Sequence, residues 1–292
     1  MRKRLILVLA MLGLVALALG LNTARNYAGW QPATDTPAER LARLEPHWRL
    51  LQPDGPGPHP AAVLLSGCDG VHDNMDYWAR QFVAMGRAAL ILDSHAPRLL
   101  DKAQAWRALC AGQVLPGAER AGDLAVALAA LRGMPGIDAS DIALLGASHG
   151  GWTVMELLRQ LGEDEPPPGL TAWPAPPDSL AAPLGPVVLL YPYCGLLNGA
   201  AKGPWPGHVQ GLMLLAELDS ITDSADCRQM GEDLIAQGAR LTVTTYPGIN
   251  HGFDQRERSS LSPLEFDAKA RARATRDIRS FMQGFAAPAA GI

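Results

Sequence analysis

Short apolar runs alternate with longer amphipathic segments along the chain after residue 47. The runs have the length of buried strands and lie at residues 61–65, 88–92, 142–145, 187–191, 212–215 and 241–245. The segments between them have the spacing of helices and lie at residues 77–85, 118–131, 152–158, 225–237 and 263–283. Because strands that alternate with helices build parallel sheets, the pattern predicts an α/β fold with a mostly parallel central sheet and helices on both faces.

Two further segments mark the limits of this pattern. Residues 47–51 predict an edge strand that precedes the first buried run. Residues 163–186 are rich in proline and have little periodicity, and the strand pattern resumes after them. We therefore interpret residues 163–186 as an inserted surface loop or flap within one α/β domain at 47–286, followed by a short tail at 287–292.

The N-terminus carries an export signal. Three basic residues, Arg2 to Arg4, precede the uninterrupted apolar run Leu5 to Leu21. This run is long for a cleaved signal and marginal for a membrane span. We interpret residues 1–21 as a cleaved signal peptide, with a retained inner-membrane anchor as the alternative, and residues 22–46 as a linker. The protein is expected to be exported, and therefore periplasmic or secreted.

Composition excludes some function classes. Of the 292 residues, 48% are hydrophobic and 18% are charged, which suits a globular domain with a large core. The formal net charge is −4, and no stripe of basic residues with interleaved aromatics follows the N-terminus. Nucleic acid is therefore not an expected partner.

The four cysteines become informative once export is expected, because disulfides persist in oxidising compartments. Cys194 and Cys227 each follow a predicted strand, so these two can form a disulfide if the strands are neighbours. Four buried free thiols are the alternative. No C-x-x-C or H-E-x-x-H spacing occurs, so neither a metal nor another cofactor is expected.

A G-x-S-x-G sequence centred on Ser148 joins the predicted strand at 142–145 to the following helix. A sharp turn from strand to helix at a serine is the nucleophile elbow, in which glycines are needed at positions where side chains would collide with the neighbouring strand and helix. The helix amino terminus would also favour a negative charge formed at Ser148. The sequence therefore predicts that Ser148 is a nucleophile.

A serine nucleophile needs a base and an acid, which follow it in the order Asp or Glu and then His in this fold. His251 follows the last predicted strand between Gly248 and Gly252, and we prefer it as base over His208 in a Gly- and Pro-rich loop. Asp219 comes first after the strand at 212–215 and is the expected acid. The alternatives for the acid are Glu217, and Asp223, which can instead cap the next helix.

The oxyanion formed during acyl transfer requires backbone amides. We expect these amides to belong to His149, directly after the nucleophile, and to Cys68 in a loop that contains two glycines. Candidate cleft residues follow other strand ends, although salt bridges and loop hydrogen bonds are their alternative role. They are Asp69, His95 and Arg98, and Trp173 and Trp205 are candidates for an apolar entrance.

These motifs together resemble the dienelactone hydrolase family within the α/β-hydrolase superfamily. The resemblance covers about residues 47–286 and rests on residues 65–70 (LSGCDG), 93–98 (DSHAPR), 146–151 (GASHGG), 217–219 (ELD) with Cys227, and 250–253 (NHGF). It implies the α/β-hydrolase fold and a nucleophile that is either cysteine or serine. Because serine stands here, the resemblance favours a general carboxylic ester as the substrate.

The function expected from the sequence is therefore a serine hydrolase that cleaves a small-molecule carboxylic ester or lactone through an acyl-enzyme. One alternative is a serine peptidase or amidase of the same fold. This is disfavoured because too little chain precedes residue 47 for a gating domain. The other alternative is a non-catalytic, membrane-tethered binding protein, against which the ordered Ser, Asp and His argue.

Overall fold

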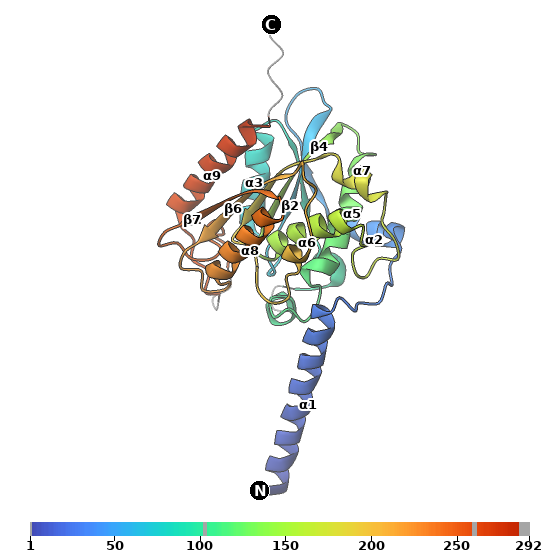
Figure 1. The fold of residues 1–292 in the computed structure, drawn as a ribbon, viewed down its shortest axis with the longest axis vertical. Coiled ribbons are helices and arrows are strands. Elements are labelled where there is room, and N and C mark those ends of the chain that lie inside the picture. Colours follow the sequence, from blue (N-terminus) through green and yellow to red (C-terminus); the bar gives the residue numbers. More distant parts are fainter. Residues whose placement is uncertain (1, 102–103, 259–261, 286–292) are drawn as a thin grey trace.

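A sheet of seven strands lies at the centre of the part of the protein that the computed structural model describes, residues 2–101, 104–258 and 262–285 (Figure 1). The strand order is β1-β3-β2-β4-β5-β6-β7, in which β1 runs antiparallel to β3 and the other neighbours are parallel. The strands are β1 (Arg49–Leu51), β2 (His59–Leu65), β3 (Ala88–Leu92), β4 (Ile137–Ala147), β5 (Leu184–Leu190), β6 (Gln210–Ala216) and β7 (Arg240–Tyr246). The predicted parallel sheet with an edge strand at its start is confirmed.

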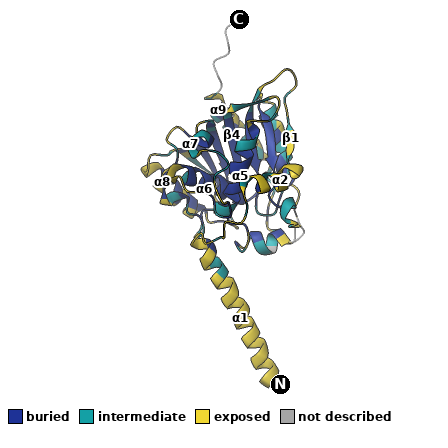
Figure 2. Ribbon diagram, turned by 90° about the vertical axis from the view of Figure 1, so that its right-hand side faces the viewer, coloured by how far each residue is buried: buried dark blue, intermediate teal, exposed yellow. Residues whose placement is uncertain are grey.

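Helices cover both faces of this sheet, as the pattern predicted. The helices are α1 (Arg2–Tyr27), α2 (Pro37–Leu44), α3 (Asp73–Val83), α5 (Gly117–Leu131), α6 (His149–Glu163), α7 (Pro177–Ala181), α8 (Ser224–Ala236) and α9 (Ala268–Gln283). Buried side chains of α5, α6, α7 and α8 form one core with the sheet, and those of α3 and α9 form a second core on the other face (Figure 2). The fold is therefore the α/β arrangement with a core on each side of the sheet.

Helix α9 begins later than the sequence pattern predicted. The periodicity suggested a start near residue 263, whereas the helix begins at Ala268. The side chain of Asp267 accepts hydrogen bonds from the amides of Lys269 (2.7 Å) and Ala270 (2.8 Å). These bonds satisfy amides that have no partner within the helix, so they define its start.

The segment before the sheet is docked onto the body of the protein. Helix α2 begins with a capping box between Thr36 and Glu39. Asp35 pairs with the proline-rich segment at Leu170, and its carbonyl accepts a hydrogen bond from the amide of Thr171 (2.9 Å). The segment expected to be a linker (22–46) and the segment expected to be a surface flap (163–186) are therefore hydrogen-bonded to each other.

A buried ion pair joins α2 to α5. Arg40 is 2% exposed, and its Nη1 donates to Oδ1 of Asp123 at 2.7 Å, while Asp123 is fully buried. Arg98 donates to both carboxylate oxygens of Asp123 at 2.8 and 2.9 Å. Burial alone would raise the pKa of Asp123, but the charges and hydrogen bonds of Arg98 and Arg40 lower it to about 2.

We expect Asp123→Asn to lower the free energy of unfolding by about 3–5 kcal/mol at neutral pH, because it leaves buried guanidinium charge uncompensated. Because the pKa of Asp123 is lower in the folded protein than in the unfolded chain, the carboxylate stabilises the fold fully at pH values above the unfolded pKa of 3.8. This stabilisation is lost as the pH falls from there through the folded pKa of about 2. Urea unfolding should therefore show a difference between wild type and variant that narrows from pH 6 to pH 2.5. The exposed Asp233→Asn variant serves as control, and a pH-independent difference would contradict the assignment.

Helix α1 extends away from the body (Figure 1). Its apolar side chains are exposed, with Leu7 at 69% and Leu14 at 67%. The helix is long and apolar enough to cross a membrane, a test that a signal sequence also passes. Figure 1 shows it leaving on the side opposite the turn before β2. Because β2 runs away from that turn, α1 lies on the side of the carboxyl ends of the parallel strands.

Candidate active site

Ser148 occupies the sharp turn between β4 and α6. Its backbone has φ 51° and ψ −113°, a conformation that residues other than glycine rarely adopt. A Cβ atom at Gly146 would lie 2.4 Å from the carbonyl oxygen of Gly150, and one at Gly150 would lie 2.3 Å from that of Leu65. The strand, the turn and the helix therefore pack as closely as the elbow motif requires.

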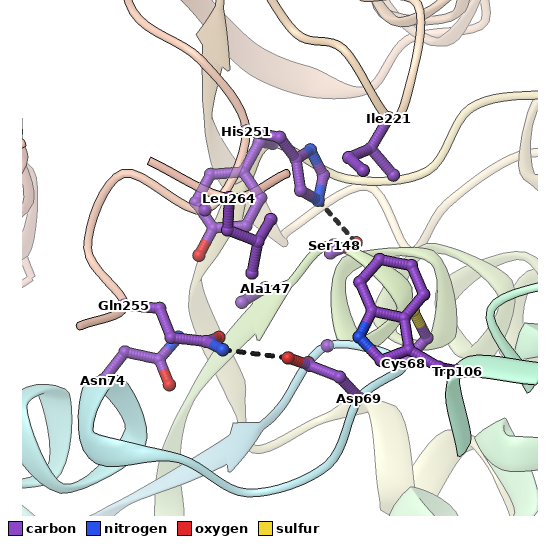
Figure 3. A pocket seen from close by; sticks show the side chains of 13 residues that line it. Cys68, Asp69, Asn74, Trp106, Ala147, Ser148, Ile221, His251, Gln255 and Leu264 are labelled. Carbon is purple, nitrogen blue, oxygen red and sulfur yellow. Dashed lines mark hydrogen bonds between the residues drawn. The ribbon is translucent and has the colours of Figure 1, made fainter. Parts of the chain in front are cut away.

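The structure brings Ser148, His251 and Asp219 together from three loops at the carboxyl ends of β4, β7 and β6. The hydroxyl of Ser148 lies 2.9 Å from Nε2 of His251, as the dashed line in Figure 3 shows. Nδ1 of the same imidazole lies 2.7 Å from Oδ2 of Asp219. His251 is 4% exposed and Ser148 is 7% exposed, so the chain of hydrogen bonds is largely shielded from water.

Asp219 is held so that one oxygen faces His251. Its Oδ1 accepts hydrogen bonds from the amides of Thr222 (2.7 Å) and Ile221 (2.9 Å), while Oδ2 accepts from His251 and from the Thr222 hydroxyl (3.0 Å). Burial would raise the pKa of Asp219, but the hydrogen bond and charge of His251 and these two amides hold it below its usual value. Asp219 therefore stays ionised beside the imidazole at neutral pH.

The tyrosine that packs against the His251 ring is held by a second buried carboxyl. Tyr191 packs edge-on against that ring, with centroids 4.7 Å apart, and its hydroxyl donates to Oδ1 of Asp254. Trp78 Nε1 donates to Oδ2 of Asp254 at 2.5 Å. Burial and the neighbouring Asp254 raise the pKa of Tyr191 well above its usual value, so the phenol stays neutral and can donate. The sequence analysis missed this cluster, because its members lie far apart in the chain.

We expect Tyr191→Phe to cost more stability than activity. The phenylalanine ring would still pack against His251, so kcat/KM should fall by less than about threefold. The fully buried Asp254 would lose one donor, which lowers the free energy of unfolding by about 1–3 kcal/mol. Paired urea unfolding and ester kinetics check this, and a large loss of kcat at unchanged stability would instead assign the hydroxyl a direct part in turnover.

The loop expected to supply an oxyanion amide lies beside the nucleophile. Gly67 approaches Ser148 closely, since a Cβ atom on Gly67 would lie 3.6 Å from the Ser148 Cβ. The following residue, Cys68, lines the same pocket as Ser148, and within the described residues its amide has no hydrogen-bond acceptor. The amide of His149 belongs to the first residue of α6. Both residues therefore lie next to Ser148, and the role of their amides in binding an oxyanion stays a prediction.

This loop is fixed at several points. Nε2 of His95 donates to the carbonyl of Cys68 at 3.1 Å. Burial and the charge of Arg120 lower the pKa of His95 to about 4, so the imidazole is neutral. Figure 3 shows Gln255 donating to Asp69. Of the candidate cleft residues, Asp69 lines the pocket and His95 supports the loop from behind, whereas Arg98 is engaged by Asp123.

A buried cation lies behind the elbow. Arg120 is fully buried and donates to the carbonyl of Ser66 (2.9 Å) and to Nδ1 of His149 (3.2 Å). Burial lowers the pKa of Arg120 to about 10, so it remains charged at neutral pH. Burial and this charge lower the pKa of His149 well below its usual value. His149 is therefore a neutral, packed side chain.

Two disulfides join the cysteines, Cys194 to Cys227 and Cys68 to Cys110. The first is the pairing considered from the sequence, and the alternative of four free thiols is wrong for this structure. The second was not anticipated, because Cys110 lies in a segment without a clear pattern. It ties the loop at Cys68 to the chain around Trp106.

Two adjoining pockets meet at Ser148 and share Cys68, Trp106 and Ile221. The smaller has a volume of about 20 Å³ and lies toward Asp69, and the larger has a volume of about 200 Å³. The larger pocket is mainly apolar and is lined by Trp106, Leu109, Trp152, Tyr193, Leu197 and the Cys68–Cys110 disulfide. It has the size and lining of a site for an apolar group attached to a carbonyl carbon at Ser148.

The aromatic residues at the pocket differ from those expected. Trp205 belongs to the hydrophobic core and is only 7% exposed, and Trp173 packs against this core. Neither residue lines the pockets at Ser148. The entrance expected from the two loops that carry Trp173 and Trp205 is therefore wrong, and the proline-rich segment with Trp173 docks on the N-terminal chain instead. Trp106 and Trp152 line the site. Trp152 could have been found from its position in the helix after the nucleophile.

No metal site accompanies this arrangement in the described residues, where no group of three or more His, Cys, Asp or Glu side chains could hold an ion. The Ser148 hydroxyl is instead hydrogen-bonded to the imidazole of His251, and Cys68 lines the same pocket. An imidazole can move a proton, and backbone amides can stabilise a negative oxygen. The seven-stranded sheet with helices on both faces is the α/β-hydrolase fold.

Comparison with known proteins agrees with this fold. The model of the dienelactone hydrolase family matches residues 208–286. A dienelactone hydrolase-like promiscuous phosphotriesterase from metagenomic libraries has a TM-score of 0.62 at 22% identity, covering 81% of this chain and 91% of its own. A thermophilic esterase, Est2 from Thermogutta terrifontis, has a TM-score of 0.59 at 14% identity, covering 84% of this chain and 90% of its own. None of the curated proteins matches the chain.

The resemblance to the dienelactone hydrolase family that the motifs indicated is confirmed over residues 208–286, the part that the family model matches. The matched part includes Asp219 and His251. At 22% and 14% identity, the two solved structures show the fold of this chain.

Proposed function

We propose that this protein is a serine hydrolase that cleaves carboxylic esters or lactones through an acyl-enzyme, with Ser148 as nucleophile, His251 as base and Asp219 as acid. The observation that carries the proposal is the continuous hydrogen-bonded chain from the Ser148 hydroxyl through His251 to Asp219. It stands beside an amide of Cys68 that has no acceptor among the described residues.

In the first half of the reaction, the Ser148 oxygen attacks the ester carbonyl carbon while its proton passes to Nε2 of His251. The carbonyl oxygen becomes an oxyanion, which the amides of Cys68 and His149 stabilise. Asp219 stabilises the imidazolium through its bond to Nδ1. When the tetrahedral intermediate collapses, His251 returns the proton to the departing alcohol oxygen, and the acyl group remains on Ser148.

In the second half, His251 takes a proton from water, and the resulting oxygen nucleophile attacks the acyl carbon. The same amides stabilise the second oxyanion. Collapse releases the carboxylic acid, and the proton returns to the Ser148 oxygen. For a lactone, the alcohol and the acid remain parts of one product.

We further propose that the reaction takes place outside the cytoplasm. The two disulfides favour an oxidising compartment, and α1 can serve as a signal or an anchor. The boundaries 1–21, 22–46 and 47–286 remain our division of the chain. The tail at 287–292 lies outside the described residues.

Reaction with a fluorophosphonate probe and turnover of a p-nitrophenyl ester series test this function together. We expect stoichiometric labelling of Ser148, located by peptide mass spectrometry, and hydrolysis whose rate depends on acyl length. The Thermogutta terrifontis esterase, which is phosphonylated by cyclosarin, is a suitable positive control. A folded protein that is neither labelled at Ser148 nor active on any ester would overturn the proposal.

A further inference from the structure

The carboxyl end of α1 is joined to the wall of the larger pocket. Nδ2 of Asn26 donates to the carbonyl of Gly112 at 2.8 Å, and Asn26 is only 6% exposed. Nδ2 of Asn22 donates to the carbonyl of Gln113 at 2.7 Å. Gly112 itself lines the pocket at Ser148. The end of the apolar helix is therefore fixed to the chain that shapes the site.

The rest of α1 is built to lie in a bilayer. The large apolar residues from Leu5 to Leu21 are each about half exposed or more. At about 1.5 Å per residue this part is roughly 25 Å long, close to the ~30 Å hydrocarbon core of a membrane. Basic residues 2–4 precede it, which favours the cytoplasmic side for the N-terminus and the outer side for the domain.

Exposed apolar side chains gather on the same side of the domain. Leu99 (87% exposed) follows β3, Leu196 (73%) follows β5, and Leu218 (60%) follows β6. Trp30 (76%) follows α1 directly. With Val114 and Ile221, these residues form what we call the apolar rim. Ile221 also lines the pocket at Ser148, so the rim reaches the site.

Other exposed apolar residues of the domain lie elsewhere. Leu50 is on the edge strand β1, and Ile235 is near the end of α8, which begins after β6 and ends shortly before β7 starts. Because α8 returns across the sheet, Ile235 lies toward the amino ends of the strands, away from the rim. Most exposed apolar residues of the domain therefore lie on one face, the face from which α1 leaves.

We propose that α1 is retained as an anchor and that the apolar rim rests on the outer surface of the bilayer that α1 enters, so that the pocket at Ser148 receives lipophilic esters dissolved in the membrane. The occupant of the rim is lipid, because the rim lies on the side of the domain from which a helix of membrane-spanning length leaves. Trp30 lies where aromatic side chains favour the interface between lipid and water.

The substrate class follows from the same placement and rests on the proposed ester hydrolase function. An ester with a long acyl chain partitions into the bilayer and can enter the pocket from the rim without crossing water. The mainly apolar pocket of about 200 Å³ can take the chain next to the carbonyl group. A short, water-soluble ester needs only Ser148 and its partners.

Docking is tested without turnover by a fluorophore on the full chain in phosphatidylcholine vesicles. All four native cysteines are paired, so Leu196→Cys and the matched control Ile235→Cys can each be labelled with a nitrobenzoxadiazole group. We expect brominated lipids to quench the label at 196 several-fold more than the label at 235. Equal quenching overturns the proposal, as does a shielded label at 196 that lipid bromine fails to quench, which would indicate a second copy or another protein.

The substrate class is tested in the same vesicles with p-nitrophenyl acetate and a long-chain 4-methylumbelliferyl ester. The double variant Leu99→Asp with Leu196→Asp should lose about tenfold or more on the long-chain ester, because two apolar side chains no longer enter the lipid. Its rate on the acetate should stay within about twofold of wild type. The control Leu50→Asp with Ile235→Asp should keep both rates.

Rim and control variants that lose the same activity on the long-chain ester would overturn the substrate class. If no variant or wild type hydrolyses either ester while the label at 196 is still quenched by lipid, the proposed hydrolase function fails and docking is supported. If the exported protein is recovered with residues 1–21 cleaved off, the proposal that α1 is retained as a membrane anchor is overturned.

Discussion

Ser148→Ala should abolish turnover, lowering kcat by about 10⁶-fold, because it removes the hydroxyl that we propose as the nucleophile. Alanine keeps the Cβ atom and therefore needs the same unusual backbone conformation as serine, with φ 51°. Removing the hydroxyl eliminates its hydrogen bond to His251. The expected stability change is therefore within about 1 kcal/mol, so the loss is chemical rather than structural.

Steady-state hydrolysis of p-nitrophenyl butyrate, with thermal unfolding of both proteins, checks this expectation. The variant should also fail to react with the fluorophosphonate probe. Ser94→Ala is the matched control, because Ser94 is buried and bonded to Arg120 without facing the pocket. Retention of more than about a thousandth of wild-type turnover would show that another group carries the reaction.

Asp219→Asn should lower kcat by about 10⁴-fold, because the imidazole would hold its proton on the wrong nitrogen. The amides of Thr222 and Ile221 point at Oδ1 of Asp219, so the asparagine carbonyl oxygen must occupy that position. Its NH₂ group then faces Nδ1 of His251 and donates to it. The imidazole proton moves to Nε2, which can no longer accept the proton of Ser148.

Kinetics on the same ester check this expectation, and the two other carboxylates of the segment provide controls. Asp223 caps α8 by accepting a hydrogen bond from the amide of Ala225 (2.8 Å), and Glu217 accepts one from Gly248 (2.8 Å). Asp223→Asn and Glu217→Gln should therefore change kcat by less than about threefold. A larger loss in Glu217→Gln than in Asp219→Asn would reassign the acid.

The positions of the three central residues were accessible from the sequence because each depends on local requirements. Gly146 and Gly150 are needed wherever a strand turns this sharply into a helix, so the motif around Ser148 implies its own geometry. Asp219 and His251 were found from their order and from the strand ends that precede them. Asp223 was correctly weighed as a helix cap, since capping also has a local signature.

The surroundings of these residues depended on contacts between distant parts of the chain. Cys110 meets Cys68 across 42 positions, and Asp254 meets Trp78 and Tyr191 from three different elements. No local pattern records such pairs, because they follow from the order of strands in the sheet and the path of the loops. For the same reason Trp173 and Trp205 were wrongly assigned to the entrance that Trp106 and Trp152 line.

The sequence by itself determined the class of fold, the nucleophile elbow and the order of the candidate catalytic residues, because periodicity, glycine geometry and chain order are local properties. Only the tertiary structure decided which side chains wall the pocket, how Cys68 is held, and that the end of α1 is bonded beside the site. These features arise from packing between segments whose separation in the sequence carries no information about their distance in space.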